Sequence, residues 1–144
     1  MARRATRSSP QPWPWPGHPR VLIEHADEAA GLALASGLRQ SGYAVAVCPG
    51  PEQSDRCPLA GAEGCAIAHG ADLIVSSLGL DTAESREVLR ALRERCPETP
   101  LIVEVAAGQE AELADLVKGC DVIVSPVDPE QLVAKVREAL PSGR

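Results

Sequence analysis

Residues 71–80 decide the fold, and they read Ala-Asp-Leu-Ile-Val-Ser-Ser-Leu-Gly-Leu. The centre of this stretch is a short, continuous aliphatic run, and two serines and a glycine follow it. A run of this length between polar residues and turn signals is typical of a strand that is buried on both faces of a parallel sheet. We therefore predict that residues 73–76 form the central strand and that Ser77 stands at its carboxyl end.

Four other apolar runs share this character, and helical patterns separate most of them. We predict strands over residues 20–23, 43–47, 101–105 and 120–125. Helices are predicted from the caps Asp27, Asp81 and Asp128 to about residues 40, 95 and 140, and over residues 110–118. This alternation predicts an α/β fold, a doubly wound, five-stranded parallel sheet with helices on both faces.

Residues 48–70 interrupt the alternation, because the second helix that the pattern requires is irregular. The segment contains three prolines and several glycines, which favour turns over helix. We predict at best a short helix around residues 61–69.

Residues 1–19 have a different composition from the rest of the chain. They are rich in proline, serine and arginine, and five prolines fall between Pro10 and Pro19. Such a segment favours extended backbone and carries too few apolar residues to build a core. We predict a disordered tail over residues 1–19 and one domain over residues 20–144. The alternative is a tail that binds an aromatic groove through Trp13 and Trp15.

The formal net charge of −6 is unevenly distributed along the chain. Three of the 14 basic residues and none of the 20 acidic residues lie in residues 1–19, so the remaining chain is strongly acidic. An acidic body is a poor match for nucleic acid or anionic lipid. No apolar run approaches the roughly 20 residues that a membrane span needs. We therefore expect a cytoplasmic protein that binds neither nucleic acid nor membranes.

Two common nucleotide-binding signatures are missing from the sequence. Neither a G-x-G-x-x-G fingerprint nor a phosphate loop follows the first predicted strand. In open sheets of this kind, ligands bind at the carboxyl ends of the strands, where the strand order reverses. The functional question therefore concerns the residues at those strand ends.

In register with these elements, residues 20–141 resemble the receiver domain of two-component response regulators. The segments that carry the resemblance are RVLI at 20–23, ADLIVSSLGL at 71–80, TPLIVEVAAG at 99–108 and GCDVIVSPVDPEQLVAKVREAL at 119–140. The resemblance implies a flavodoxin-like strand order, 2-1-3-4-5, and a cis peptide bond before Pro126. It also implies Mg²⁺-dependent phosphorylation of an aspartate at the end of the third strand.

The family's phosphorylation chemistry has no equivalent residues in this chain. The phosphoacceptor aspartate falls on Ser77, the invariant lysine on Ser125, and the threonine or serine that ends the fourth strand on Val105. Serine supplies neither an attacking carboxylate nor a cation, and valine cannot hydrogen-bond a phosphoryl oxygen. These three positions predict a receiver that cannot be phosphorylated.

The acidic pair that follows the first strand in the family is also replaced. It falls on His25 and Ala26, and only Glu24 and Asp27 remain nearby as displaced acids. Mg²⁺ prefers hard oxygen ligands in near-octahedral geometry. We therefore predict a degenerate, atypical receiver that is not an enzyme and needs no cofactor.

The resulting functional hypothesis is a stand-alone pseudo-receiver in bacterial signal transduction. It acts as a phosphorylation-independent protein-interaction module. Receivers signal through their fourth helix, fifth strand and fifth helix, so we expect a protein partner or a second copy to bind there.

A cysteine-based metal or redox sensor on the same fold is the alternative function. Its candidate ligands are the thiolates of Cys48, Cys57 and Cys65 and the imidazole of His69 or His25. Zinc accepts such a set, although the spacing matches no common zinc finger or ribbon. A Cys57–Cys65 disulfide is a further alternative. We interpret Cys96 and Cys120, which fall on core-facing stripes, as buried hydrophobic residues.

A hydrolase is the least favoured function. Ser77 and His25 should end adjacent strands, and Asp27 could then orient the imidazole. The sequence around Ser77 lacks the G-x-S-x-G pattern of a nucleophile elbow, so we interpret Ser77 as a small polar residue at a strand end.

Overall fold

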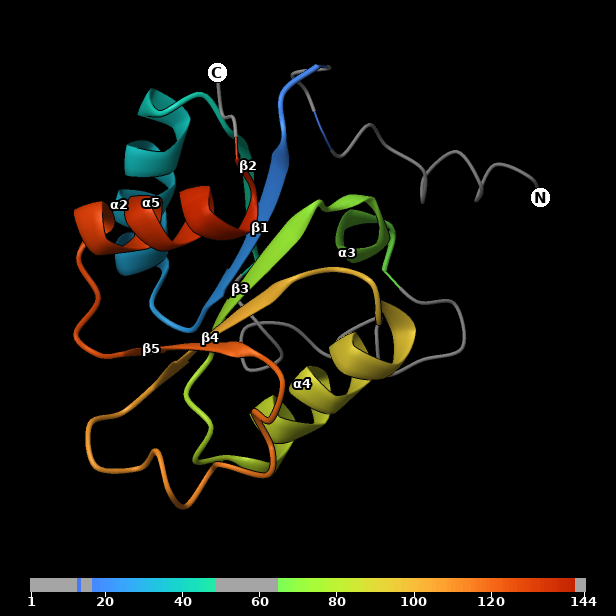
Figure 1. Cartoon of the computed structure of the whole chain (residues 1–144), viewed down its shortest axis with the longest axis vertical. Helices are drawn as coiled ribbons and strands as arrows, with labels where there is room; N and C mark the ends of the chain where they lie inside the picture. Colours follow the sequence, from blue (N-terminus) through green and yellow to red (C-terminus); the bar gives the residue numbers. More distant parts are fainter. Residues whose placement is uncertain (1–12, 14–16, 49–64, 142–144) are drawn as a thin grey trace.

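The computed structural model describes residue 13 and residues 17–48 and 65–141. Its centre is a five-stranded parallel sheet with the strand order β2-β1-β3-β4-β5 (Figure 1). The strands are β1 (Arg20–His25), β2 (Ala44–Cys48), β3 (Leu73–Ser77), β4 (Leu101–Val105) and β5 (Asp121–Val124). The predicted fold class and the order 2-1-3-4-5 are confirmed, with β3 in the middle of the sheet.

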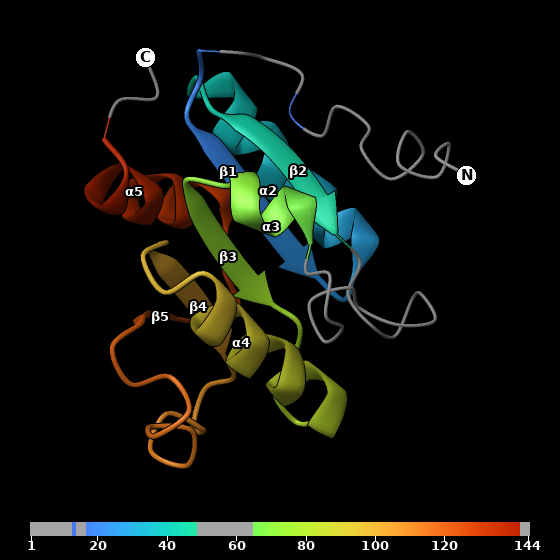
Figure 2. The same cartoon turned by 90° about the vertical axis from the view of Figure 1, so that its right-hand side faces the viewer.

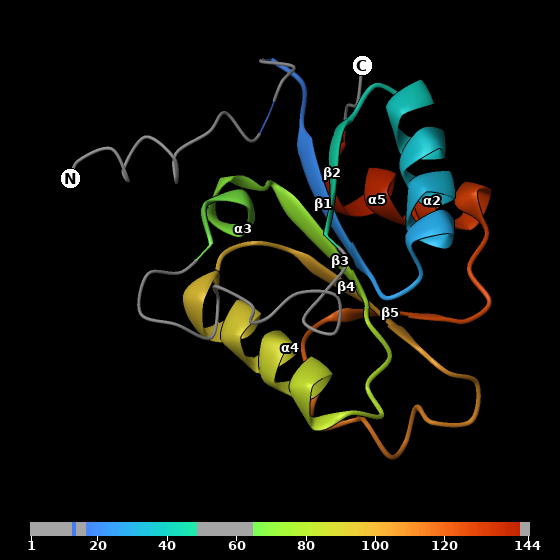
Figure 3. The ribbon, with the colours of Figure 1, turned by 180° about the vertical axis from the view of Figure 1, so that it is seen from behind.

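Helices cover both faces of the sheet, as a doubly wound fold requires. One face carries α2 (Glu28–Gln40) and α5 (Pro129–Ala139), and the other carries α3 (Ala66–Gly70) and α4 (Ala83–Arg95) (Figure 3). Figure 2 looks onto the second face, with α3 in front of β1 and α4 in front of β4. The expected short helix around residues 61–69 is α3, and residues 49–64 lie outside the described part of the chain.

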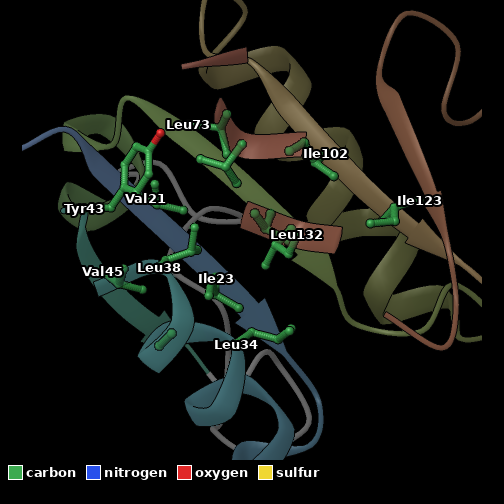
Figure 4. Close-up of a cluster of buried hydrophobic side chains, with 13 residues drawn as sticks. Val21, Ile23, Leu34, Leu38, Tyr43, Val45, Leu73, Ile102, Ile123 and Leu132 are labelled. Atoms are coloured by element: carbon green, nitrogen blue, oxygen red, sulfur yellow. The ribbon is translucent and has the colours of Figure 1, made fainter. Parts of the chain in front are cut away.

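The largest hydrophobic cluster lies between the sheet and helices α2 and α5 (Figure 4). It consists of Val21, Ile23, Leu34, Ala35, Leu38, Tyr43, Val45, Leu73, Val75, Ile102, Ile123, Leu132 and Val136. Nearly all are aliphatic, because the chain has no phenylalanine. Tyr43 is the one aromatic member, and its hydroxyl donates to the carbonyl of Leu140 at 2.8 Å. This bond ties the start of β2 to the end of α5.

Two smaller clusters fill the opposite face of the sheet. The α3/α4 cluster consists of Trp13, Leu22, Ala44, Ala68, Ala71, Ile74, Leu78, Val88, Leu92 and Cys96. The second cluster consists of Leu80, Leu89, Val103, Val105, Leu113 and Val117. Alternate residues of each strand therefore serve opposite faces, as the two-residue period of a strand dictates.

Side-chain caps explain where the helices begin. The carboxylate of Asp27 accepts from the backbone N–H of Ala30 at the start of α2. A capping box joins Asp128 to Gln131 at the start of α5. The prediction that Asp81 caps α4 is wrong by one residue, because the hydroxyl of Thr82 accepts from Ser85 instead.

The predicted helix over residues 110–118 is wrong, because this segment forms a series of turns. Its backbone bonds alternate in span: Leu113 N–H donates to Gln109 four residues back, whereas Ala114 N–H donates to Ala111 three residues back. The guanidinium of Arg93 in α4 donates to the carbonyls of Leu116 and Lys118. These tertiary bonds satisfy the segment without a regular helix.

Trp13 packs against the domain, although it belongs to the segment predicted to be a disordered tail. Its side chain is 7% exposed and lies in the α3/α4 cluster. A Cβ atom at Gly70 would come within 3.0 Å of the indole nitrogen, so the missing side chain of this glycine leaves room for the ring. The rest of residues 1–16 lies outside the described residues.

Candidate functional site

The carboxyl ends of β1, β3 and β4, and the residue that follows β5, surround a cavity of about 330 Å³. All five positions that correspond to the family's phosphorylation site line it. They are His25, Ala26, Ser77, Val105 and Ser125. These positions therefore meet in one cavity, at the point where the strand order reverses between β1 and β3.

Backbone bonds hold these strand ends together. His25 lies directly opposite Ser77 in the parallel register of β1 and β3. Ala26 N–H donates to the carbonyl of Ser77 at 3.3 Å, and Ser125 N–H donates to the carbonyl of Val105 at 2.9 Å. The cis peptide bond expected between Ser125 and Pro126 is present.

His25 and Asp27 do not form the pair that a catalytic triad requires. The backbone N–H of Asp27 donates to Nδ1 of His25 at 3.0 Å. The carboxylate of Asp27 instead caps α2 by accepting from Ala30 at 3.2 Å. Because a backbone group already occupies Nδ1, the carboxylate does not orient the imidazole toward Ser77 as a triad needs. This geometry gives no support to the hydrolase hypothesis.

The other strand ends present side chains without a charge. Ser77 is buried, and the hydroxyl of Ser125 donates to the carbonyl of Val105 at 3.4 Å. Hydroxyl and alkyl groups at these positions do not fit the Mg²⁺ that the resemblance implies, because that ion prefers carboxylate oxygens and octahedral geometry. We therefore derive no phosphoryl-transfer step at this site.

Acidic residues line other parts of the same cavity. These are Asp27, Asp81 and Glu104, and no lysine or arginine is among the described residues that line it. Sequence reasoning missed Asp81 and Glu104 as members of the site, because neither stands at a position that the resemblance marks. Because the charged side chains among the described lining residues are acidic, the cavity is unsuited to an anionic ligand.

Glu24 does not belong to this cavity, although it precedes His25 in β1. Its side chain is 3% exposed, and its Oε1 has no hydrogen-bond partner. Glu24 lies opposite Ser76 in β3, whose buried hydroxyl is also without a partner. Burial raises the pKa of Glu24 to about 8. The alternation of the strand was the signal for this placement, since Leu22 and Glu24 share the face turned away from His25.

The cysteines gather on the same covered face of the sheet. Cys96 belongs to the α3/α4 cluster, and Cys48 and Cys65 pack against it. Sγ of Cys96 lies 3.9 Å from Nδ1 of His69. Cys96 is buried as predicted, but it has a polar neighbour that the sequence did not indicate. Cys120 was predicted to be buried as well; it packs against the second cluster but is only half-buried.

The zinc hypothesis remains without a ligand set in the structure. Among residues 13, 17–48 and 65–141, no group of three or more His, Cys, Asp or Glu side chains is arranged to hold a metal ion. Cys57 lies outside the described residues. The proposed combination of Cys48, Cys57 and Cys65 with His69 or His25 therefore stays a prediction.

None of the described helices is long and apolar enough to cross a bilayer.

Comparison with solved structures supports the fold, whereas the sequence comparisons find no match. No family model matches the sequence, and no curated protein matches it. A CheY-like receiver domain protein from Methanospirillum hungatei is 23% identical, with a TM-score of 0.64, and the match covers 88% of this chain and 97% of that one. The chemotaxis response regulator CheY4 of Vibrio cholerae is 20% identical, with a TM-score of 0.64 and coverage of 85% and 99%.

A third solved structure is a response regulator receiver protein from Sinorhizobium medicae. It is 18% identical, with a TM-score of 0.64 and coverage of 89% of this chain and 98% of that chain. Identities this low establish the fold and leave the chemistry to be argued from the site. Together with the sheet order, they show that this chain has the fold of a response regulator receiver domain.

Proposed function

We propose that the protein is a pseudo-receiver, a phosphorylation-independent protein-interaction module of bacterial signal transduction, and not an enzyme. The observation that carries this proposal is the lining of the cavity at the carboxyl ends of the strands. Ser77, Val105 and Ser125 stand where the resemblance expects a carboxylate, a hydroxyl and a cation. The chain has kept the receiver fold and replaced the groups that phosphoryl transfer needs.

The charge of the cavity supports the same proposal. Asp27, Asp81 and Glu104 line it without a lysine or arginine among the described lining residues. A phosphodonor brings negative charge on its phosphoryl oxygens, and catalysis requires cations to offset that charge. Electrostatic repulsion therefore disfavours the approach of a phosphodonor to this cavity.

Incubation with acetyl phosphate and Mg²⁺ tests the proposal. We expect the intact mass of the wild-type protein to stay unchanged, because no carboxylate stands at the end of β3. The variant His25→Asp/Ala26→Asp/Ser77→Asp/Ser125→Lys restores the metal-binding acids, the acceptor and the cation, and we expect it to gain one phosphate under the same conditions. Phosphate on the wild-type protein, for instance on Asp27 or Asp81, would contradict the proposal.

The interaction surface that we propose lies along β5 and α5. Among the described strands β5 is at an edge of the sheet, and Val124 in it is 36% exposed. An exposed strand edge with an apolar side chain suits association with another protein. Residues 106–120 form the adjoining part of this surface, where the resemblance expects the fourth helix.

Matched substitutions at two exposed large hydrophobic residues of the described part of the chain test this surface. We expect Val124→Arg to weaken self-association or the capture of a partner by at least tenfold in affinity. Leu32→Arg on α2, where the side chain is 48% exposed, is the control and should leave binding unchanged. Analytical sedimentation measures self-association. Affinity capture with each variant immobilised as the bait measures partner binding. Equal effects of the two substitutions would count against β5 as the binding surface.

A further inference from the structure

Helix α3 and the C-terminal end of α4 lie next to each other on one face of the sheet (Figures 1 and 3). His69 in α3 and Cys96 at the end of α4 meet there, with Nδ1 and Sγ 3.9 Å apart. Cys65 caps the start of α3, and the N–H of His69 donates to its carbonyl at 2.9 Å. Cys65 and His69 therefore lie at the two ends of one helical turn.

The two cysteines are also linked by what they pack against. Both contact the α3/α4 cluster. Burial is the largest cause that raises the pKa of Cys96, and the negative charge of an ionised Cys65 would be the second largest. His69 connects the two cysteines, because it lies one helical turn after Cys65 and its Nδ1 contacts Sγ of Cys96. Their exposure differs, since Cys65 is half-buried and Cys96 is 9% exposed.

We propose that Cys65 and Cys96 form a redox-active pair that closes a reversible disulfide when a peroxide oxidises the protein, with His69 as the base. This proposal is independent of the proposed function, because it uses the covered face of the sheet and not the cavity at the strand ends. The pairing also differs from the Cys57–Cys65 disulfide that the sequence left open.

The chemistry proceeds in two steps that balance. The more exposed thiol of Cys65 gives up its proton and attacks hydrogen peroxide, and the O–O bond breaks. Cys65 becomes a sulfenic acid, and the departing hydroxide takes up that proton and leaves as water. Nδ1 of His69 then accepts the thiol proton of Cys96. The Cys96 thiolate attacks the Cys65 sulfur, the S–O bond breaks, and the departing hydroxide recovers the proton from His69 as a second water. Two thiols and one peroxide therefore give one disulfide and two waters.

The bond would join α3 to the C-terminal end of α4. It would cross-link residues 65 and 96, so it would restrict the unfolded chain and raise the melting temperature of the oxidised protein. A dithiol reductant would reverse the change, because thiol–disulfide exchange opens the bond.

Peptide mapping of the full-length protein after hydrogen peroxide treatment, with free thiols alkylated, tests the pairing. We expect tryptic peptides 57–86 and 96–118 to be joined and to separate after reduction. Because peptide 57–86 contains Cys57 as well as Cys65, Cys57→Ser is the matched control. The link should persist in Cys57→Ser and disappear in Cys65→Ser and Cys96→Ser.

The rate of disulfide formation tests the role of His69. We expect His69→Gln to slow closure of the bond at least tenfold at neutral pH and to leave the final pairing unchanged. Far-ultraviolet circular dichroism of the reduced variants confirms that each is folded before oxidation. A link that vanishes in Cys57→Ser, a link to peptide 40–56, or no loss of thiols in the wild-type protein would overturn the proposal.

Discussion

Two regions at the carboxyl ends of the same strands differ in chemistry. The cavity at the strand ends receives His25 and Ser77, together with Ser125. The face covered by α3 and α4 receives Glu24 and Ser76, which immediately precede the first two in sequence. Each pair is aligned across β1 and β3. The side-chain period of a strand therefore sends neighbouring residues into opposite environments.

The difference between the regions lies in how well the polar groups are satisfied. Nδ1 of His25 and the hydroxyl of Ser125 have backbone partners. Oε1 of Glu24 and the hydroxyl of Ser76 are buried without any. Burying an unpaired polar group costs free energy, and an ionised carboxylate costs more than a hydroxyl. The covered face should therefore respond more strongly than the cavity to changes in protonation and to substitution.

The pH dependence of stability is where we expect the largest effect. The pKa of Glu24 rises from 4.5 to about 8 on folding, so the folded protein binds an extra proton between these values. The free energy of unfolding should fall as pH rises through this window, by roughly 4 to 5 kcal/mol. Urea denaturation at pH 5, 7 and 9 measures the change.

Glu24→Gln isolates this contribution, because the amide keeps the shape and does not titrate. We expect the free energy of unfolding of this variant to fall much less than that of the wild-type protein between pH 5 and pH 9. Glu104→Gln, at the half-buried cavity position, serves as the control and should retain it. An identical decline in the wild-type protein and in Glu24→Gln would show that Glu24 is not the group responsible.

An intermediate effect is expected where α4 holds the turns of residues 110–118. Arg93→Met removes the guanidinium that donates to the carbonyls of Leu116 and Lys118. We expect a loss of about 1 to 3 kcal/mol in the free energy of unfolding, because charge-assisted bonds are lost and both carbonyls need new partners. Arg90→Met, on the exposed side of α4, is the control and should stay within about 0.5 kcal/mol of the wild-type protein. Urea denaturation compares the two, and equal losses would contradict the role of Arg93.

The adjacent serines of β3 give the smallest effect and the most direct comparison of the two regions. Ser76→Ala removes a buried hydroxyl that has no partner, so we expect it to stabilise the protein by about 0.5 to 1 kcal/mol. Ser77→Ala, in the cavity, should change stability by less than about 0.5 kcal/mol. Thermal unfolding at pH 6 measures both, and a clear loss of stability in Ser76→Ala would reveal a partner for its hydroxyl.

Local signals in the sequence predicted most of the fold. Apolar runs fixed the position of each strand to within one or two residues, because strand burial depends on a short contiguous pattern. The caps Asp27 and Asp128 were found for the same reason, since a cap bonds to residues two or three positions away. The resemblance to receiver domains supplied the five cavity positions, and they line one cavity because all strands of a parallel sheet end at the same edge.

The sequence by itself thus determined the strands, most helix starts and the uncharged residues Ser77, Val105 and Ser125 at the strand ends. Only the tertiary structure decided that Oε1 of Glu24 is buried without a partner, that Arg93 holds residues 110–118 in turns, and that Cys96 contacts His69. Each of these depends on side chains that lie far apart in sequence and approach only when the helices pack on the sheet. Periodicity describes which face a residue occupies, but it does not specify which residue of another element lies opposite.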